Sequence, residues 1–158
     1  MEILPLSSPR AFSALQLLQH AAGALANDFA GLGIVFYDSV AALPHLQLQV
    51  GGDEQFQLPV MGLEPICAVL ARTARRSSAW HDGFHFLHQN TGTLTHLCQF
   101  IAPPLPSLAD TAPRASGARH MTALLASRVT GIAAIGLLTH ERAASIYEAG
   151  RLTFSAIL

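Results

Sequence analysis

The sequence predicts an α/β fold, a single layered domain in which helices flank a mixed central β-sheet. The chain has 158 residues, 51% of them hydrophobic and 12% charged, so it is long enough for one core and too apolar for disorder. Short apolar runs typical of buried strands alternate along the chain with stretches of helical periodicity. Because no internal repeat or second unit is evident, we expect one domain over residues 1–158.

The first half of the chain predicts two helices separated by short strands. Residues 11–27 have the apolar spacing of an amphipathic helix, and residues 31–38 (GLGIVFYD) form a short run of β-formers that is typical of a buried strand. Residues 45–50 alternate weakly up to a Gly-Gly turn, and residues 56–61 are expected to return from it. A second helix is expected at 63–78, with arginines near its C-terminus.

The second half predicts two hairpins around a helix and a core strand. Asn90-Thr91-Gly92 and Ala149-Gly150 are turn signals between alternating segments, and residues 132–138 form a continuous apolar run, as expected of a strand covered on both faces. The expected elements are strands at 84–89 and 94–101, a helix from 117 to about 129, and strands at 132–138, 145–147 and 152–157.

The charge pattern restricts the possible partners. The net charge is −1, so we expect neither a nucleic-acid polymer nor an anionic membrane as partner. All nine basic residues are arginines, which excludes lysine-dependent chemistry and leaves arginine to bind any phosphate. The apolar stretches are too short to span a membrane and the N-terminus lacks the pattern of a signal peptide, so we expect a cytoplasmic protein. The two cysteines, Cys67 and Cys98, are expected to be buried thiols.

Asp82-Gly83-Phe84 places a carboxylate beside open backbone N–H groups just before a predicted strand. This arrangement suits a metal ion or a ribose hydroxyl, although Asp-Gly is also a common turn in which the carboxylate caps its own backbone. Thr139-His140-Glu141 follows the predicted core strand at the end where α/β sheets usually bind ligands, although a plain surface turn has the same pattern.

Gly117-Ala118-Arg119-His120 opens a predicted helix with cations at the end where the helix dipole is positive. Such residues oppose the local rule unless an anion lies beside them, so this segment indicates anion binding at the helix N-terminus. The alternative is an ion pair between Arg119 and an acidic residue such as Asp110.

In order and spacing, these segments resemble the diadenylate cyclase (DAC) domain, and the resemblance covers residues 82–154. That family has an Asp-Gly-Ala strand, a Gly-Thr-Arg-His-Arg helix start, a core strand that ends in Ser-Glu-Glu, and a closing hairpin. The resemblance implies a DAC-like fold and a nucleotide site. It places Asp82, Gly83, Phe84, Gly117, Arg119, His120, Thr122 and Thr139 at the nucleotide, and Asp82 and Glu141 in catalysis if the domain is active.

The sequence departs from the family pattern where the family's catalysis takes place. Phe84, Ala118, Met121 and His140 stand where the family has Ala, Thr, Arg and Glu. Each lost charge-assisted contact is worth about 1.5–3 kcal/mol, which disfavours catalysis more than binding. The pattern resembles the DAC-like sensor branch, so we expect a sensor that binds ATP or a cyclic dinucleotide, with an effector protein or a homo-oligomer as further partners.

Three alternatives stay open at this point. An active cyclase would use Mg²⁺ or Mn²⁺ at Asp82, and Arg114 could replace the missing arginine. The chain has eight histidines, and His88 and His96 could meet across the first hairpin in a metal site, although no strict ligand spacing recurs. A purely structural interaction domain would need no ligand.

Overall fold

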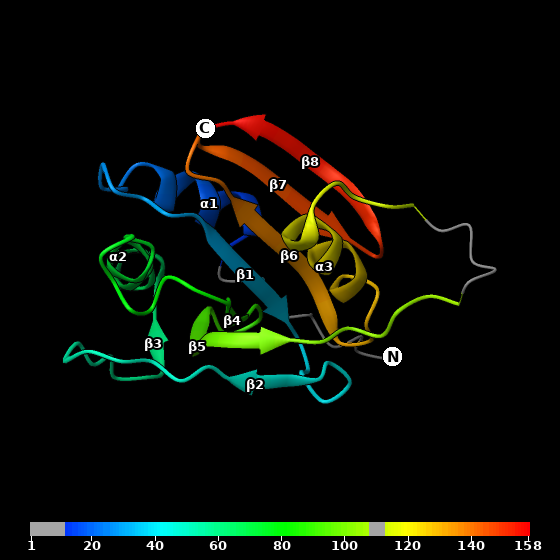
Figure 1. Ribbon diagram of the computed structural model, residues 1–158, viewed down its shortest axis with the longest axis horizontal. Helices are drawn as coiled ribbons and strands as arrows, with labels where there is room; N and C mark the ends of the chain where they lie inside the picture. Colours follow the sequence, from blue (N-terminus) through cyan, green and yellow to red (C-terminus); the bar gives the residue numbers. More distant parts are fainter. Residues whose placement is uncertain (1–11, 108–112) are drawn as a thin grey trace, which may run out of the picture.

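The computed structural model describes residues 12–107 and 113–158, in which helices cover both faces of a mixed β-sheet, as the sequence predicts (Figure 1). The helices are α1 (Ala14–Ala22), α2 (Leu63–Thr73) and α3 (Ala118–Ala126). The strands are β1 (Leu32–Tyr37), β2 (His45–Gln47), β3 (Val60–Met61), β4 (Phe84–His88), β5 (Thr93–Ile101), β6 (Ile132–Leu138), β7 (Ala143–Glu148) and β8 (Arg151–Ile157).

All eight strands belong to one sheet in the order β2-β5-β4-β1-β6-β7-β8, and β3 also pairs with β5. Strands β1 and β4 run parallel, and every other pair is antiparallel. Strand β1 lies at the centre, and all six of its residues are buried because helices cover both faces of the sheet. This explains why its sequence is a continuous apolar run rather than an alternating one.

The two faces carry separate core clusters. Helices α1 and α2 pack Leu17, Leu18 and Leu70 against one face. Helix α3 packs Ala123 and Leu124 against the other face. Because α3 is a single helix of nine residues, it leaves room along both of its sides. Among the described residues, no helix is long and apolar enough to cross a membrane.

The helices are shorter than the sequence predicts. Ser13 and Gln16 form a capping box that starts α1, and the helix ends at Gly23, short of the predicted residue 27. Helix α2 ends at Thr73 because the chain beyond it pairs elsewhere. Phe29 forms a β-bridge with Arg75, and this tertiary pairing replaces the last predicted turn.

The expected hairpin between residues 45–50 and 56–61 is wrong. Strand β2 pairs with the far end of β5, and β3 pairs with its beginning at Thr93 and Leu94. Strand β5 has nine residues, so its free edge accommodates both short strands in succession. The connection across residues 48–59 therefore runs beside the sheet. The predicted hairpins β4–β5 and β7–β8 and the core strand β6 are confirmed.

Candidate functional site

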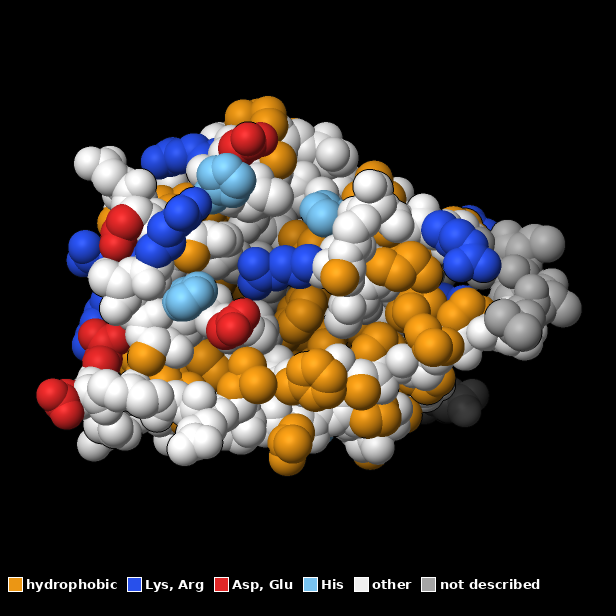
Figure 2. Space-filling model, in the orientation of Figure 1, with side chains coloured by type: hydrophobic (Ala, Val, Ile, Leu, Met, Phe, Trp, Pro, Cys, Tyr) orange, Lys and Arg blue, Asp and Glu red, His pale blue; other side chains and the backbone are white. Residues whose placement is uncertain are grey.

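A hollow of about 340 Å³ lies beside α3, within the size range of small-molecule sites. Its lining brings together five residues that the sequence singles out: Asp82, Gly83, Phe84, Arg119 and Thr122. Leu48, Gln99, Phe100 and Ile101 complete the lining. Figure 2 shows this face of the molecule, with hydrophobic side chains along its β2–β5 margin. We call the hollow the Asp82–Arg119 pocket.

Gly83 allows the segment before β4 to lie directly against β5. Its φ is +76°, and a Cβ atom there would be 2.8 Å from the carbonyl oxygen of Gln99. The opposing strand is irregular at this point, since Cys98 has a φ of +52° and the β4–β5 register shifts. Glycine therefore meets both a conformational and a steric requirement, and it places Asp82 at the mouth of the pocket.

The Arg119 guanidinium spans the pocket from α3 to the start of β1. Nη2 lies 3.4 Å from the carbonyl oxygen of Gly83, and Cζ lies 5.8 Å from the centre of the Phe84 ring. A Cβ atom at Gly31 would be 3.0 Å from Nη1, and one at Gly33 would be 3.4 Å from Nη2. Two glycines of the GLG segment thus make space for this cation, a role that glycines in strands often have and that no pattern in the sequence predicts.

Burial and the charge of Asp82 shift the pKa of Arg119 in opposite directions. Burial lowers the pKa of Arg119, and the carboxylate of Asp82 partly offsets this effect. An arginine guanidinium stays protonated in proteins, so the pocket holds a fixed positive charge with a negative one beside it.

Phe84 forms an apolar wall of the pocket. Its side chain belongs to the core cluster under α3, with only 7% of the residue exposed. A Cβ atom at Gly33 would lie 2.9 Å from its ring. Little of the ring is therefore free to stack on a base, and the more exposed Phe100 offers a larger aromatic surface at the rim.

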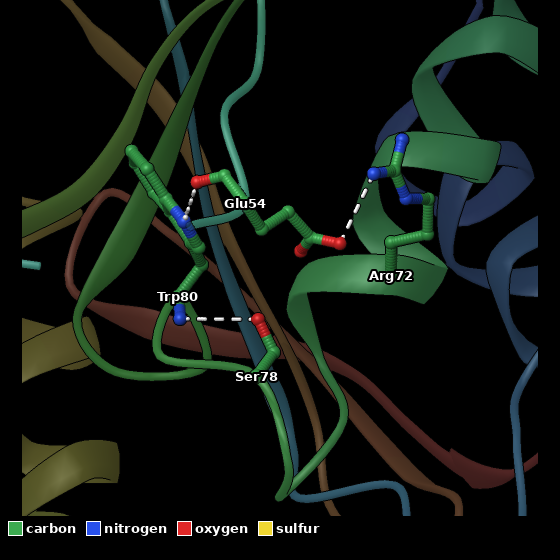
Figure 3. A network of polar contacts seen from close by, with 4 residues as sticks. All are labelled: Glu54, Arg72, Ser78 and Trp80. Atoms are coloured by element: carbon green, nitrogen blue, oxygen red, sulfur yellow. Dashed lines mark hydrogen bonds and ion pairs between the residues drawn. The ribbon is translucent and has the colours of Figure 1, made fainter. Parts of the chain in front are cut away.

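Leu48 reaches the pocket from the long connection between β2 and β3. Its N–H donates to the carbonyl oxygen of Cys98 (2.9 Å). Further along, the indole N–H of Trp80 donates to the carbonyl oxygen of Glu54 (3.0 Å), and the Glu54 carboxylate pairs with Arg72 on α2 (3.0 Å; Figure 3). These contacts hold residues 48–59 beside α2, and no local sequence pattern predicts them.

His85 lies behind the pocket and connects three elements. The backbone N–H of Cys98 donates to Nδ1 of His85 (3.1 Å), so this nitrogen is unprotonated and the ring hydrogen is on Nε2. Nε2 faces the Thr73 hydroxyl (3.4 Å), which itself donates to the carbonyl oxygen of Leu70 (3.0 Å). Burial, reinforced by the charge of Arg119, lowers the pKa of His85 to about 3. A neutral ring thus links the end of α2 to the irregular part of β5.

Four of the predicted site residues do not line the Asp82–Arg119 pocket: Gly117, His120, Thr139 and Glu141. Gly117 is the N-cap of α3, and the Thr139 hydroxyl accepts the N–H of Ala143 in the turn after β6. Glu141 is exposed in that turn, 3.8 Å from His140. Asp110, the alternative partner of Arg119, lies outside the described residues.

The comparisons with known proteins identify the fold. No protein-family model matches the chain, and no curated protein matches it. DacA from Staphylococcus aureus, a diadenylate cyclase solved as a double mutant, aligns with a TM-score of 0.52 and 19% identity over 91% of this chain and 88% of its own. The chain has a DAC-like fold. A hypothetical membrane spanning protein from Bacillus cereus aligns with a TM-score of 0.55 and 16% identity; the alignment covers 96% of this chain and 66% of that protein.

Metal ligands are sparse in this DAC-like domain. No group of three or more His, Cys, Asp or Glu side chains in residues 12–107 and 113–158 could hold a metal ion. His88 does not face His96, because the register pairs Phe86 with His96 and Thr93 with His88. Asp82 is the one carboxylate among the described residues of the pocket lining. One carboxylate fits Mg²⁺ that arrives with nucleotide phosphates, since that ion keeps several waters and takes few protein ligands.

Proposed function

We propose that this DAC-like domain is a nucleotide sensor that binds an adenine nucleotide or a cyclic dinucleotide in the Asp82–Arg119 pocket. One observation carries the proposal: the pocket combines a fixed arginine, a carboxylate and a threonine with apolar walls. A phosphate needs partners such as the arginine and the threonine, a ribose can use the carboxylate, and a base needs apolar walls.

Each part of a nucleotide has a complementary group. The planar guanidinium of Arg119 can meet two phosphate oxygens at once. Asp82 can accept hydrogen bonds from ribose hydroxyls, and the Thr122 hydroxyl can donate to a phosphate. Leu48 and Phe100 offer apolar and aromatic surface to the base.

The same geometry favours binding over catalysis. Glu141, which the family resemblance assigns to catalysis, is 77% exposed and does not line the pocket. Met121 stands where the family has a second arginine, and its sulfur accepts the N–H of Ala115. Nothing in the described lining replaces that charge, so Arg119 is the pocket's single cation. A sensor of this kind would pass its signal to an effector protein or to a second copy of the chain.

Calorimetric titration of the purified chain with ATP and with cyclic di-AMP tests the proposal. We expect Arg119→Gln to weaken binding by about ten- to a hundredfold, the equivalent of one charge-assisted contact. Arg76→Gln is the matched control, because Arg76 is exposed and is not one of the lining residues of the pocket. Equal affinity of the two variants would overturn the site.

The second candidate function is an active diadenylate cyclase, which the retained Asp82 and Arg119 favour. In that case Asp82 would hold Mg²⁺ or Mn²⁺, which neutralises phosphate charge, and two copies would have to face each other because each binds one ATP. Incubation with ATP and Mn²⁺, followed by mass spectrometry for cyclic di-AMP, decides between the two functions. Product that disappears in Asp82→Ala would establish the enzyme. Binding without product would favour the sensor.

A further inference from the structure

A second hollow lies on the other side of α3, between the helix, the segment that precedes it and strands β7 and β8. Its volume is about 420 Å³, larger than that of the Asp82–Arg119 pocket, and no lining residue is shared between the two. We call it the His120–Ser145 hollow. Its lining includes Arg114, Ser116, His120, Ser145, Tyr147 and Ser155.

Ser145 is a mostly buried residue whose hydroxyl opens into this hollow. The residue is 8% exposed, and its hydroxyl makes no hydrogen bond to any residue of the described ranges. Its cross-strand neighbour on β8 is Ser155, and the alternation along β7 places Ser145 and Tyr147 on the same face, under α3. No buried side-chain oxygen or nitrogen of the described ranges lacks a hydrogen-bond partner, so the Ser145 hydroxyl is accessible in the hollow and free to donate to a ligand or water there.

His120 and Tyr147 supply a further donor. The Tyr147 hydroxyl lies 2.7 Å from Nδ1 of His120. Burial raises the pKa of Tyr147, so the phenol stays neutral and can donate to Nδ1. In the neutral ring the hydrogen is then on Nε2, and in the protonated ring Nε2 also carries one. Nε2 of His120 is therefore a donor whenever the phenol donates to Nδ1 or the ring is protonated.

The charge around the hollow is positive. Arg114 lines it and makes no ion pair with any residue that the structure describes, and none of the described lining residues is acidic. Helix α3 begins here at Gly117, which provides no side-chain cap, so the first N–H groups of the helix add partial positive charge.

We propose that the His120–Ser145 hollow is a binding site for an oxyanion, a phosphate or carboxylate group held by Arg114, His120 and Ser145. The site is separate from the Asp82–Arg119 pocket and does not depend on the function proposed for that pocket. The Ser145 hydroxyl and Nε2 of His120 would donate to the anion, and Arg114 would neutralise it from the open side.

The test is an NMR titration of the full chain with inorganic phosphate at constant ionic strength, followed through the His120 ring signals and the Ser145 amide. We expect saturable shifts that Arg114→Gln and Ser145→Ala weaken about tenfold or more, as for loss of one contact to a charged group. Arg151→Gln, an exposed arginine of β8 outside the lining, is the matched control and should bind as the original chain does.

Arg119→Gln keeps this site distinguishable from the nucleotide pocket. The proposal expects the phosphate shifts at His120 and Ser145 to persist in this variant even if nucleotide binding is lost. Loss of the shifts in Arg119→Gln, or full binding in Arg114→Gln and Ser145→Ala, would overturn it. A parallel titration with acetate identifies the source of the oxyanion: preference for phosphate indicates a phosphoester, and equal binding indicates a carboxylate.

Discussion

Arg119 and His120 are neighbours in the sequence, yet they serve opposite sides of α3. Successive helical residues point about 100° apart, so one side chain enters the Asp82–Arg119 pocket and the other enters the His120–Ser145 hollow. The first site has a carboxylate and apolar walls beside its cation. The second has donors and positive charge without an acid among its described lining residues. The first turn of α3 therefore supplies side chains to two hollows with different linings, although Arg119 and His120 form one motif in the sequence.

The largest expected effect comes from His85, which lies behind the Asp82–Arg119 pocket and makes the stability of the whole protein depend on pH. His85 lies behind the Asp82–Arg119 pocket with a pKa of about 3, against 6.5 for the free side chain. Between these values the unfolded chain binds a proton that the folded chain does not, so stability is complete above pH 6.5 and falls as the pH decreases toward 3. The slope from this one group approaches about 1.4 kcal/mol per pH unit.

Urea unfolding between pH 4.5 and 7.5 measures this slope. In His85→Gln we expect a less stable protein at pH 7 whose stability depends less on pH, because the titrating group is gone. His20→Gln is the control, since His20 is exposed at the end of α1. An unchanged slope in His85→Gln would show that His85 does not stay neutral in the folded state.

The next largest effect comes from two glycines that share a backbone conformation and differ in surroundings. Gly83 and Gly117 have φ values of +76° and +86°, but a Cβ atom would meet the Gln99 carbonyl at Gly83 and nothing within 4 Å at Gly117. Gly117→Ala should cost about 1–3 kcal/mol from backbone strain alone. Gly83→Ala should cost more and also weaken nucleotide binding.

Denaturant unfolding and nucleotide titration of both variants test this comparison. The expected outcome is a larger loss of stability in Gly83→Ala than in Gly117→Ala, with phosphate binding at His120 retained in the former. Equal losses of stability would mean that the contact between Gly83 and β5 does not shape the pocket.

The sequence predicted the parts of this molecule that depend on local pattern. Strand β6 and the hairpin β4–β5 follow from apolar runs and turn residues, and Asp82 and Arg119 stand out by their position at element ends. Strands β2 and β3 were paired wrongly because their partner, β5, is distant in sequence and outcompetes the local hairpin.

The features of the site that the sequence did not predict all depend on tertiary contacts. Gly31 and Gly33 matter for the pocket only because the Arg119 guanidinium lies against them. His85 matters only because the fold brings Thr73 and Cys98 to its two ring nitrogens. No residue spacing in the sequence predicts these contacts. The divergence of Arg119 and His120 is different, because helical geometry alone predicts it once a helix is assumed.

The smallest expected effect concerns the contacts that hold residues 48–59, which bring Leu48 to one pocket and have no counterpart at the other. The Glu54–Arg72 pair is largely exposed, with side-chain exposures of 39% and 56% (Figure 3). Such pairs contribute about 0.2–1 kcal/mol. The contacts of Trp80 with the Glu54 carbonyl and with the Phe56 ring do not depend on the ion pair.

We therefore expect Arg72→Gln to change stability by less than about 1 kcal/mol and to leave nucleotide affinity within about fivefold. A double-mutant cycle with Glu54→Gln measures the coupling. A larger loss of affinity would show that Arg72 controls the position of Leu48, and nucleotide binding in the Asp82–Arg119 pocket would then also depend on α2.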